Sequence, residues 1–293
     1  MLTHLSLFSG IGGIDLASEW AGFTTVGQCE WADYPTKVLE KHWPNVPRWR
    51  DIRDVTADSV RAAGIGRIDL LSGGFPCQPH SVAGKREASN DDRDLWPELA
   101  RVIGELKPRW FLGENVPGLL TSEAGRFFGR VLGDLATLGY RVGWIVYGAK
   151  DVGANHKRDR VFIVAYSGET GREERFVSAI TEGMGFGSRM GDEELADAGK
   201  ESNAQTCKTV GAVRNRLNTW DYVGRSSWRS EPRIPRAVSK SELGRMADGF
   251  SNGLDALGCL GNAVVPAQVY PILKAIAEIE QQNEVITCQH QPK

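Results

Sequence analysis

Short apolar stretches alternate with segments of helical apolar spacing over the first 165 residues of the chain. The strand-like stretches are residues 5–8, 24–29, 68–72, 110–113, 140–147 and 160–166. The helical segments are residues 14–20, a segment capped by Asp33 with Pro35 in its first turn, residues 95–106 capped by Asp94, and residues 127–138. Strands that alternate with helices in this way predict an α/β fold with a doubly wound, mostly parallel sheet.

The composition is typical of a globular enzyme and argues against several other classes of protein. The 293 residues are 41% apolar, and the formal net charge is -2. The chain has no run of about 18 apolar residues and no secretory signal, so we expect a cytoplasmic protein without membrane contact. The five cysteines are scattered and never spaced as Cys-x-x-Cys. This spacing argues against a disulfide framework and against a metal site.

The regular pattern stops near residue 167. Residues 167–205 are rich in glycine and acidic side chains, whereas residues 208–245 are rich in basic side chains interleaved with Trp220, Tyr222 and Trp228. This mixture is typical of a surface that contacts nucleic-acid phosphates, although a solvated charged face would have the same composition. Helical spacing returns after Gly261 and continues to about residue 280.

A glycine-rich loop, residues 8–13, joins the first predicted strand to the first predicted helix. It departs from the dinucleotide fingerprint G-x-G-x-x-G, because Asp15 replaces the third glycine and would bring a charge next to a pyrophosphate. A nucleoside cofactor without phosphates fits better, with Glu30 accepting hydrogen bonds from ribose hydroxyls and Asp51 near the adenine. A plain tight turn and a nicotinamide dehydrogenase are the alternatives.

Cys77 and Glu114 each follow a predicted strand. Cys77 comes after residues 68–72 through two glycines, and Glu114 comes directly after residues 110–113. The carboxyl ends of parallel strands meet at one edge of a sheet, so we expect the thiol and the carboxyl group close together. Alone, Cys77 could be a small buried apolar side chain and Glu114 a cap or an ion-pair partner. Together they are the nucleophile and proton donor that addition to an electron-poor ring carbon requires.

Several short motifs, in their order along the chain, resemble those of the DNA cytosine-5 methyltransferase family. They are residues 8–13, Pro76-Cys77-Gln78, Glu114-Asn115-Val116, Arg158-Asp159-Arg160 and Gly261-Asn262-Ala263-Val264-Val265-Pro266, together with residues 91–97. Two places depart from the family pattern: His156 and Lys157 stand where the family has Gln-Arg, and His80 stands where it has Phe. Neither departure touches the nucleophile, so we expect activity to survive.

The resemblance implies an S-adenosylmethionine-dependent, Rossmann-like methyltransferase fold with a second, smaller target-recognition domain. The catalytic and cofactor-binding domain would comprise residues 1–165 and 255–293, and the target-recognition region residues 166–254. The implied reaction transfers a methyl group from S-adenosylmethionine to C5 of a flipped cytosine in a specific, short duplex DNA sequence, through a covalent Cys77 adduct. One chain would hold the full catalytic set, so a monomer suffices, and a cognate restriction endonuclease could act on the same site.

The resemblance also assigns site residues. In catalysis, Arg158 and Arg160 would lower the pKa of the Cys77 thiol, and a protonated Glu114 would hydrogen-bond N3 of the cytosine. The implied cofactor-binding residues are Phe8, Gly10, Ile11, Gly12, Gly13, Glu30, Trp31, Asp51, Ile52, Pro76, Leu95, Asn262 and Val264. The implied DNA contacts are Gln78, Ser81, Lys85 and Asn115.

Two other functions fit the same motifs. A cytosine-5 methyltransferase of the same fold could act on RNA, and a non-catalytic relative could bind DNA without turnover. The presence of Cys77, Glu114 and both arginines argues against the second alternative, because a protein that only binds DNA has no need of that thiol.

Overall fold

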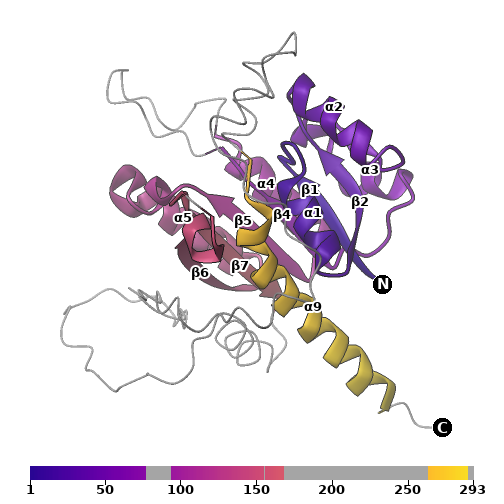
Figure 1. Ribbon diagram of the computed structural model, residues 1–293. Coiled ribbons are helices and arrows are strands. Elements are labelled where there is room, and N and C mark those ends of the chain that lie inside the picture. The colour runs from indigo at the N-terminus through magenta and orange to yellow at the C-terminus, as the bar shows by residue number, and fades with distance from the viewer. Residues whose placement is uncertain (77–93, 155, 168–262, 290–293) are drawn as a thin grey trace.

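The computed structural model describes residues 1–76, 94–154, 156–167 and 263–289 (Figure 1). The predicted target-recognition region, residues 166–254, lies almost entirely outside the described residues, and so does the segment 77–93 that begins with Cys77.

The described strands form one seven-stranded sheet in the order β3-β2-β1-β4-β5-β7-β6. Their bounds are Leu2–Leu7 for β1, Phe23–Cys29 for β2, Arg48–Trp49 for β3, Leu70–Gly73 for β4, Trp110–Asn115 for β5, Tyr140–Gly148 for β6 and Asp159–Ser167 for β7. Strands β1 to β5 pair in parallel, whereas β7 is antiparallel to both of its neighbours, β5 and β6. The structure therefore confirms the doubly wound, mostly parallel sheet.

Helices cover both faces of this sheet. The described helices are α1 (Gly13–Trp20), α2 (Asp33–His42), α3 (Ala57–Ala62), α4 (Trp96–Leu106), α5 (Arg126–Thr137) and α9 (Pro266–Gln289). Residues of α3, α4 and α5 pack into a core on one face, and residues of α1 and α9 pack into a second core on the other. Figure 1 shows α9, in yellow, lying beside α1 across the middle of the sheet. None of the described helices has the length and apolarity needed to cross a bilayer.

The two-residue period of the strands supplies both cores. Trp110 and Leu112 of β5 belong to the core beneath α1 and α9, whereas Phe111 between them belongs to the opposite core. All three side chains are fully buried. Burial of a large apolar side chain stabilises a fold by about 1.5–3 kcal/mol, so a central strand apolar on both faces ties the two layers together.

The C-terminal helix is tied to the sheet by a buried acidic side chain as well as by apolar packing. Glu280 of α9 is fully buried, forms an ion pair with Arg109 and accepts a hydrogen bond from Nε1 of Trp110 at 3.0 Å. Removal of one partner of such a pair leaves a buried charge uncompensated and destabilises a protein by about 3–5 kcal/mol.

The structure corrects some sequence-based boundaries. Strand β3 and helix α3 were missed, because a two-residue strand and a six-residue helix are too short to show a periodic apolar pattern. Asp33 was predicted as the cap of α2 but is its first residue; Ala32 is the cap, and the Asp33 carboxylate forms an ion pair with Arg50. The cap of α4 is Leu95 rather than Asp94, although the Asp94 carboxylate accepts a hydrogen bond from the backbone nitrogen of Trp96 at 3.1 Å.

Candidate active site

A cavity of about 650 Å³ opens at the carboxyl ends of β1 to β5. Its walls come from the segments that follow these strands, and from the start of the C-terminal segment. In open α/β sheets ligands bind at this edge, where the strand order reverses, here between β1 and β4. Most of the proposed cofactor residues line the cavity: Phe8, Gly10, Ile11, Gly13, Glu30, Trp31, Asp51, Ile52, Pro76, Leu95 and Val264.

The two remaining proposed cofactor residues are Gly12, which does not line the cavity, and Asn262. Gly12 faces α2, and a Cβ atom there would lie 2.4 Å from the ring of Trp43, so its lack of a side chain serves packing. Its φ of 85° is also one that glycine adopts without strain. Asn262 lies outside the described residues.

The glycine loop is held against the other walls of the cavity. The backbone nitrogen of Gly10 donates to Oε2 of Glu30 at 2.8 Å. At Gly13 a Cβ atom would lie 2.4 Å from the backbone oxygen of Val264, so only glycine allows the C-terminal segment to approach this closely. The loop between β1 and α1 therefore contacts Glu30, which follows β2, and Val264, which precedes α9.

The carboxylate of Glu30 is fixed by the backbone on two sides. Besides the bond from Gly10, its Oε1 accepts a hydrogen bond from the backbone nitrogen of Ala32 at 2.8 Å. A carboxylate has about four acceptor positions, so these two bonds orient the group and leave capacity for the hydroxyls of a ligand.

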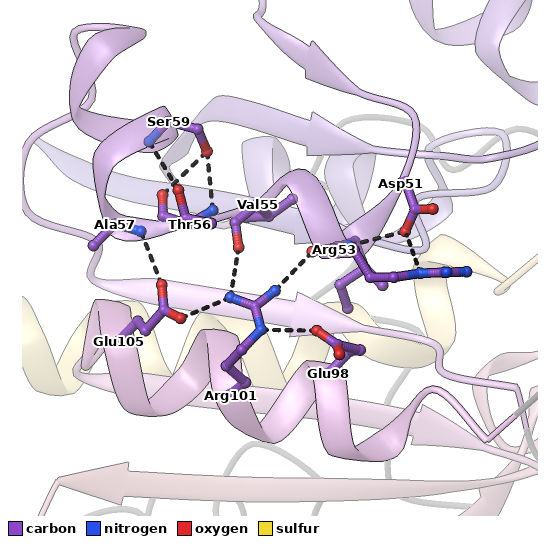
Figure 2. Close-up of polar contacts among 10 residues, drawn as sticks. Asp51, Arg53, Val55, Thr56, Ala57, Ser59, Glu98, Arg101 and Glu105 are labelled. Carbon is purple, nitrogen blue, oxygen red and sulfur yellow. Dashed lines mark hydrogen bonds and ion pairs between the residues drawn. The ribbon is translucent and has the colours of Figure 1, made fainter. Parts of the chain in front are cut away.

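The wall that carries Asp51 is built on Arg101 of α4 (Figure 2). The Arg101 guanidinium donates to the backbone oxygens of Ile52 and Val55, both at 3.1 Å, and forms ion pairs at 2.7 Å with Glu98 and Glu105. Figure 2 shows this side chain rising from α4 between the two carboxylates toward the loop after β3.

Further contacts complete this wall. Oδ1 of Asp51 accepts a hydrogen bond from the backbone nitrogen of Arg53 at 2.9 Å, which caps the short helix η1 (Ile52–Asp54). Glu105 also accepts a hydrogen bond from the backbone nitrogen of Ala57 at 3.0 Å (Figure 2). The shape of this wall therefore depends on α4, which itself supplies no predicted cofactor residue.

Glu114 lies at the other end of the cavity. It is 8% exposed, and its Oε1 forms an ion pair with Nε of Arg160 at 2.7 Å. Burial raises the pKa of the Glu114 carboxyl group, while the positive charges of Arg160 and Arg158 oppose that rise. A Cβ atom at Gly74 would lie 3.3 Å from Oε2 of Glu114, so the glycine brings the chain after β4 against this carboxyl group.

Arg158 has an unusual backbone. Its φ is 40°, in the left-handed region that non-glycine residues rarely occupy. Its guanidinium donates to the backbone oxygen of Ala263, and its own backbone oxygen accepts a hydrogen bond from the amide nitrogen of Gln268 at 3.1 Å. Burial and the neighbouring charge of Arg160 lower the pKa of Arg158, and Glu114 opposes this change.

Asn115, a proposed DNA contact, is engaged by the backbone on two sides in the structure. Its side chain is buried, with Nδ2 donating to the backbone oxygen of Phe75 at 3.0 Å and Oδ1 accepting from the backbone nitrogen of Val116 at 2.8 Å. Asn115 therefore ties the end of β5 to the segment that leads into Cys77. The other proposed DNA contacts, Gln78, Ser81 and Lys85, lie outside the described residues together with Cys77.

The comparison with known protein families decides where the chain belongs. The sequence model for the C-5 cytosine-specific DNA methylase family matches residues 2–222. The chain belongs to this family. The match covers all strands of the described sheet and most of the segments that line the cavity, and it ends before Ala263, Val264 and the C-terminal helix.

Curated relatives match more than half of the chain. Type II methyltransferase M.NgoBI of Neisseria gonorrhoeae is 39% identical over 168 residues, which are 57% of this chain and 51% of that protein. Type II methyltransferase M.BsuFI of Bacillus subtilis is 36% identical over 171 residues, 58% of this chain and 40% of that protein. The chain thus spans about half the length, or less, of these relatives.

The fold is also similar to that of a solved structure. A candidate DNA modification methyltransferase encoded within an E. coli prophage superposes with a TM-score of 0.62 at 19% identity, over 96% of this chain and 100% of that one. At this level of identity the similarity concerns the fold.

The side chain of Asp15 does not lie where the sequence predicted it. Its side chain is fully buried and does not line the cavity; it accepts hydrogen bonds from Oγ of Ser6 at 3.0 Å and from Nε2 of Gln28 at 2.8 Å. The carboxyl group faces the sheet, so it would not lie beside a pyrophosphate as the sequence analysis assumed.

The sequence did not indicate two residues that support the cavity from outside its lining, Arg101 and Gln268. Arg101 lies in a helical segment that carries ion-pair partners one turn away on either side, which is also the pattern of an ordinary surface helix. Gln268 is separated by more than 100 positions from the backbone groups that it binds, so no local spacing could have indicated it.

Proposed function

We propose that the protein transfers a methyl group from S-adenosylmethionine to C5 of a flipped cytosine in a specific duplex DNA sequence, through a covalent Cys77 adduct. The observation that supports this most strongly is the buried carboxyl group of Glu114, paired with Arg160 at the edge of the cavity. It lies against Gly74, three residues before Cys77 in the chain. Family membership supports the same reaction.

The cavity suits S-adenosylmethionine as the methyl donor. Its volume lies within the range of about 300–1,000 Å³ typical of small-molecule sites. Glu30 and Asp51 would accept hydrogen bonds from the hydroxyl and amino groups of the nucleoside, and the exposed ring of Trp31 offers an apolar surface at the same wall. When bound, S-adenosylmethionine supplies an electrophilic methyl group and a positive charge, which suits a cavity lined by carboxylates.

The side chains of the protein would then act on the base. The Cys77 thiolate adds to C6 of the cytosine, and the S–C6 bond makes C5 nucleophilic. Glu114 would place its proton at N3 and so stabilise the negative charge that develops there; burial raises the pKa of this carboxyl group, which favours its protonated form. Once C5 carries the methyl group, a base would remove the C5 proton, the electron pair would form the C5–C6 double bond and expel the Cys77 thiolate, and N3 would return its proton to Glu114.

The positive charges around Glu114 would favour the thiolate form of Cys77. Arg158 and Arg160 bring two positive charges to a single carboxyl group, so this cluster carries an excess positive charge. A neighbouring anion would balance it, and a nearby positive charge is what lowers the pKa of a reactive cysteine. The same cluster would therefore serve the nucleophile and the proton donor.

Double-stranded DNA is the proposed substrate, and residues 166–254 are the proposed recognition region. We also propose that the protein acts as a monomer in the cytoplasm. The matched relatives are named Type II methyltransferases. A restriction endonuclease that acts on the same sequence is the partner proposed from these names.

Expression in a bacterial host without cytosine methylation, followed by genome-wide mapping of 5-methylcytosine, tests the proposal. We expect one short methylated sequence in cells that express the protein and none in cells that express Cys77→Ser. Methylation of cellular RNA without methylation of DNA would favour the RNA methyltransferase. An unmethylated genome and transcriptome from folded protein would favour a DNA-binding relative without turnover.

A further inference from the structure

We infer that Gln268, in the first turn of α9, is a positioning residue for Arg158 and acts through it on methyl transfer. The inference rests on the proposed function. Nε2 of Gln268 donates to the backbone oxygen of Tyr147 at 2.8 Å and to the backbone oxygen of Arg158 at 3.1 Å. One side-chain amide thus joins the end of β6 to the residue before β7, and joins both to the C-terminal helix.

Only a hydrogen-bond donor can fill this place. Both partners are carbonyl oxygens, so the atom that faces them must be the amide nitrogen. The Gln268 side chain is fully buried, and a carbonyl that loses its donor in a buried site is left without its hydrogen bond. An apolar or acidic side chain of the same length therefore cannot replace glutamine.

The backbone of Arg158 needs such a restraint. A left-handed conformation of a non-glycine residue is unfavourable and persists only where the surroundings hold it. Gln268 holds the backbone of Arg158, and the backbone oxygen of Ala263 accepts a hydrogen bond from its guanidinium. Both contacts come from the short segment that opens the C-terminal helix, outside the part of the chain that the family model matches.

The position of Arg158 bears on the chemistry of Glu114. Among the described residues, the charged groups that act on Glu114 are Arg160 and Arg158, and those that act on Arg158 are Arg160 and Glu114. Gln268 itself does not line the cavity. A change at Gln268 should therefore alter the methyl-transfer step and leave the affinity for S-adenosylmethionine intact.

The first test detects Arg158 directly and needs no activity. Nε of Arg158 is buried, so its Nε–Hε group should give a resolved NMR signal, assigned by its loss in Arg158→Lys. We expect Gln268→Met, which keeps the side-chain length without a donor, to shift or broaden this signal. Glu280→Gln, which changes the other buried polar side chain of α9, should leave it in place. An unchanged signal in Gln268→Met, or the same change in both variants, would overturn the inference.

The second test separates catalysis from binding. We expect Gln268→Met and Gln268→Glu to lower kcat by about 10- to 100-fold, the effect of a small displacement of a reacting group. The Kd for S-adenosylmethionine should stay within about twofold in both variants, and kcat should be retained in Glu280→Gln. Equal losses of kcat in the Gln268 and Glu280 variants would show a general effect of helix docking and refute the inference. If the wild-type protein neither binds S-adenosylmethionine nor methylates, the proposed function fails, and the NMR signal alone decides whether Gln268 positions Arg158.

Discussion

Replacement of Asp15 by asparagine should stabilise the protein, and more strongly at higher pH. Asp15 is fully buried beneath the glycine loop, and burial raises the pKa of its carboxyl group from 3.8 to about 6. In Asp15→Asn the side-chain oxygen can still accept a hydrogen bond from Nε2 of Gln28, and the new amide nitrogen can donate to the hydroxyl oxygen of Ser6. The Gln28 amide is held in this orientation because its Oε1 accepts a hydrogen bond from Nε of Arg48 at 2.8 Å. The substitution therefore keeps the hydrogen bonds and removes a buried charge.

The pH dependence follows from the two protonation equilibria. Between about pH 4 and 6 the native state holds a proton on Asp15 that the unfolded chain has lost, so the stability of the wild type falls as the pH rises through this window. One pKa unit corresponds to about 1.4 kcal/mol. With pKa values of 3.8 and about 6, the penalty of ionised Asp15 grows by about 1.4 kcal/mol from pH 5 to pH 8 and reaches about 3 kcal/mol above pH 7. Asparagine has no such penalty at any pH.

Urea unfolding at pH 5 and pH 8 measures this effect. The free energy of unfolding of Asp15→Asn should exceed that of the wild type by about 1.4 kcal/mol more at pH 8 than at pH 5, with unchanged m-values. Asp58→Asn, which removes the same charge from an exposed position on α3, serves as the control. Its free energy of unfolding should differ from that of the wild type by the same amount at pH 5 and at pH 8. A constant difference for Asp15→Asn across this range would refute the argument that the buried carboxyl group carries a shifted pKa.

Three further substitutions test the cavity. Glu114→Gln should lower kcat by about 10²- to 10³-fold while S-adenosylmethionine still binds, because the group that protonates N3 is lost; single-turnover kinetics and calorimetry measure the two effects. Arg101→Met should raise the Kd for S-adenosylmethionine by about tenfold, because the loop after β3 loses two hydrogen bonds from a charged donor. An unchanged Kd would show that the loop keeps its shape without these hydrogen bonds. Gly13→Ala should weaken binding and lower the melting temperature, because its Cβ atom would lie 2.4 Å from the backbone oxygen of Val264, whereas Gly66→Ala, which meets no atom within 4 Å, should change neither.

The central sheet could be predicted because its strands carry a simple signal. Residues 110–113 read as a strand from apolar content alone, and the structure shows why: the successive side chains of Trp110, Phe111 and Leu112 enter opposite cores, so all three are apolar. Among the described residues, the segments after strands β1 to β5 line one cavity, because the carboxyl ends of parallel strands converge whatever the details of the loops.

The errors concern contacts between distant parts of the chain. The orientation of Asn115 was not predicted, because it depends on the backbone oxygen of Phe75, 40 residues away in sequence. The direction of the Asp15 carboxylate likewise depends on Gln28 of the neighbouring strand. Side-chain direction is decided by tertiary packing, which a linear pattern of residue types does not contain.

The arrangement of α9 has a consequence for how the protein is made. The face of the sheet that α9 covers includes Leu70, Trp110 and Phe162. Phe162, the last of the three to be synthesised, leaves the ribosome about 100 residues before the helix that buries them, and the other two leave it earlier still. At synthesis rates of about 5–20 residues per second, this apolar face stays open to water for about 5–20 s. During that interval the nascent chain is a substrate for chaperones, and translation pauses in the intervening codons would lengthen its exposure.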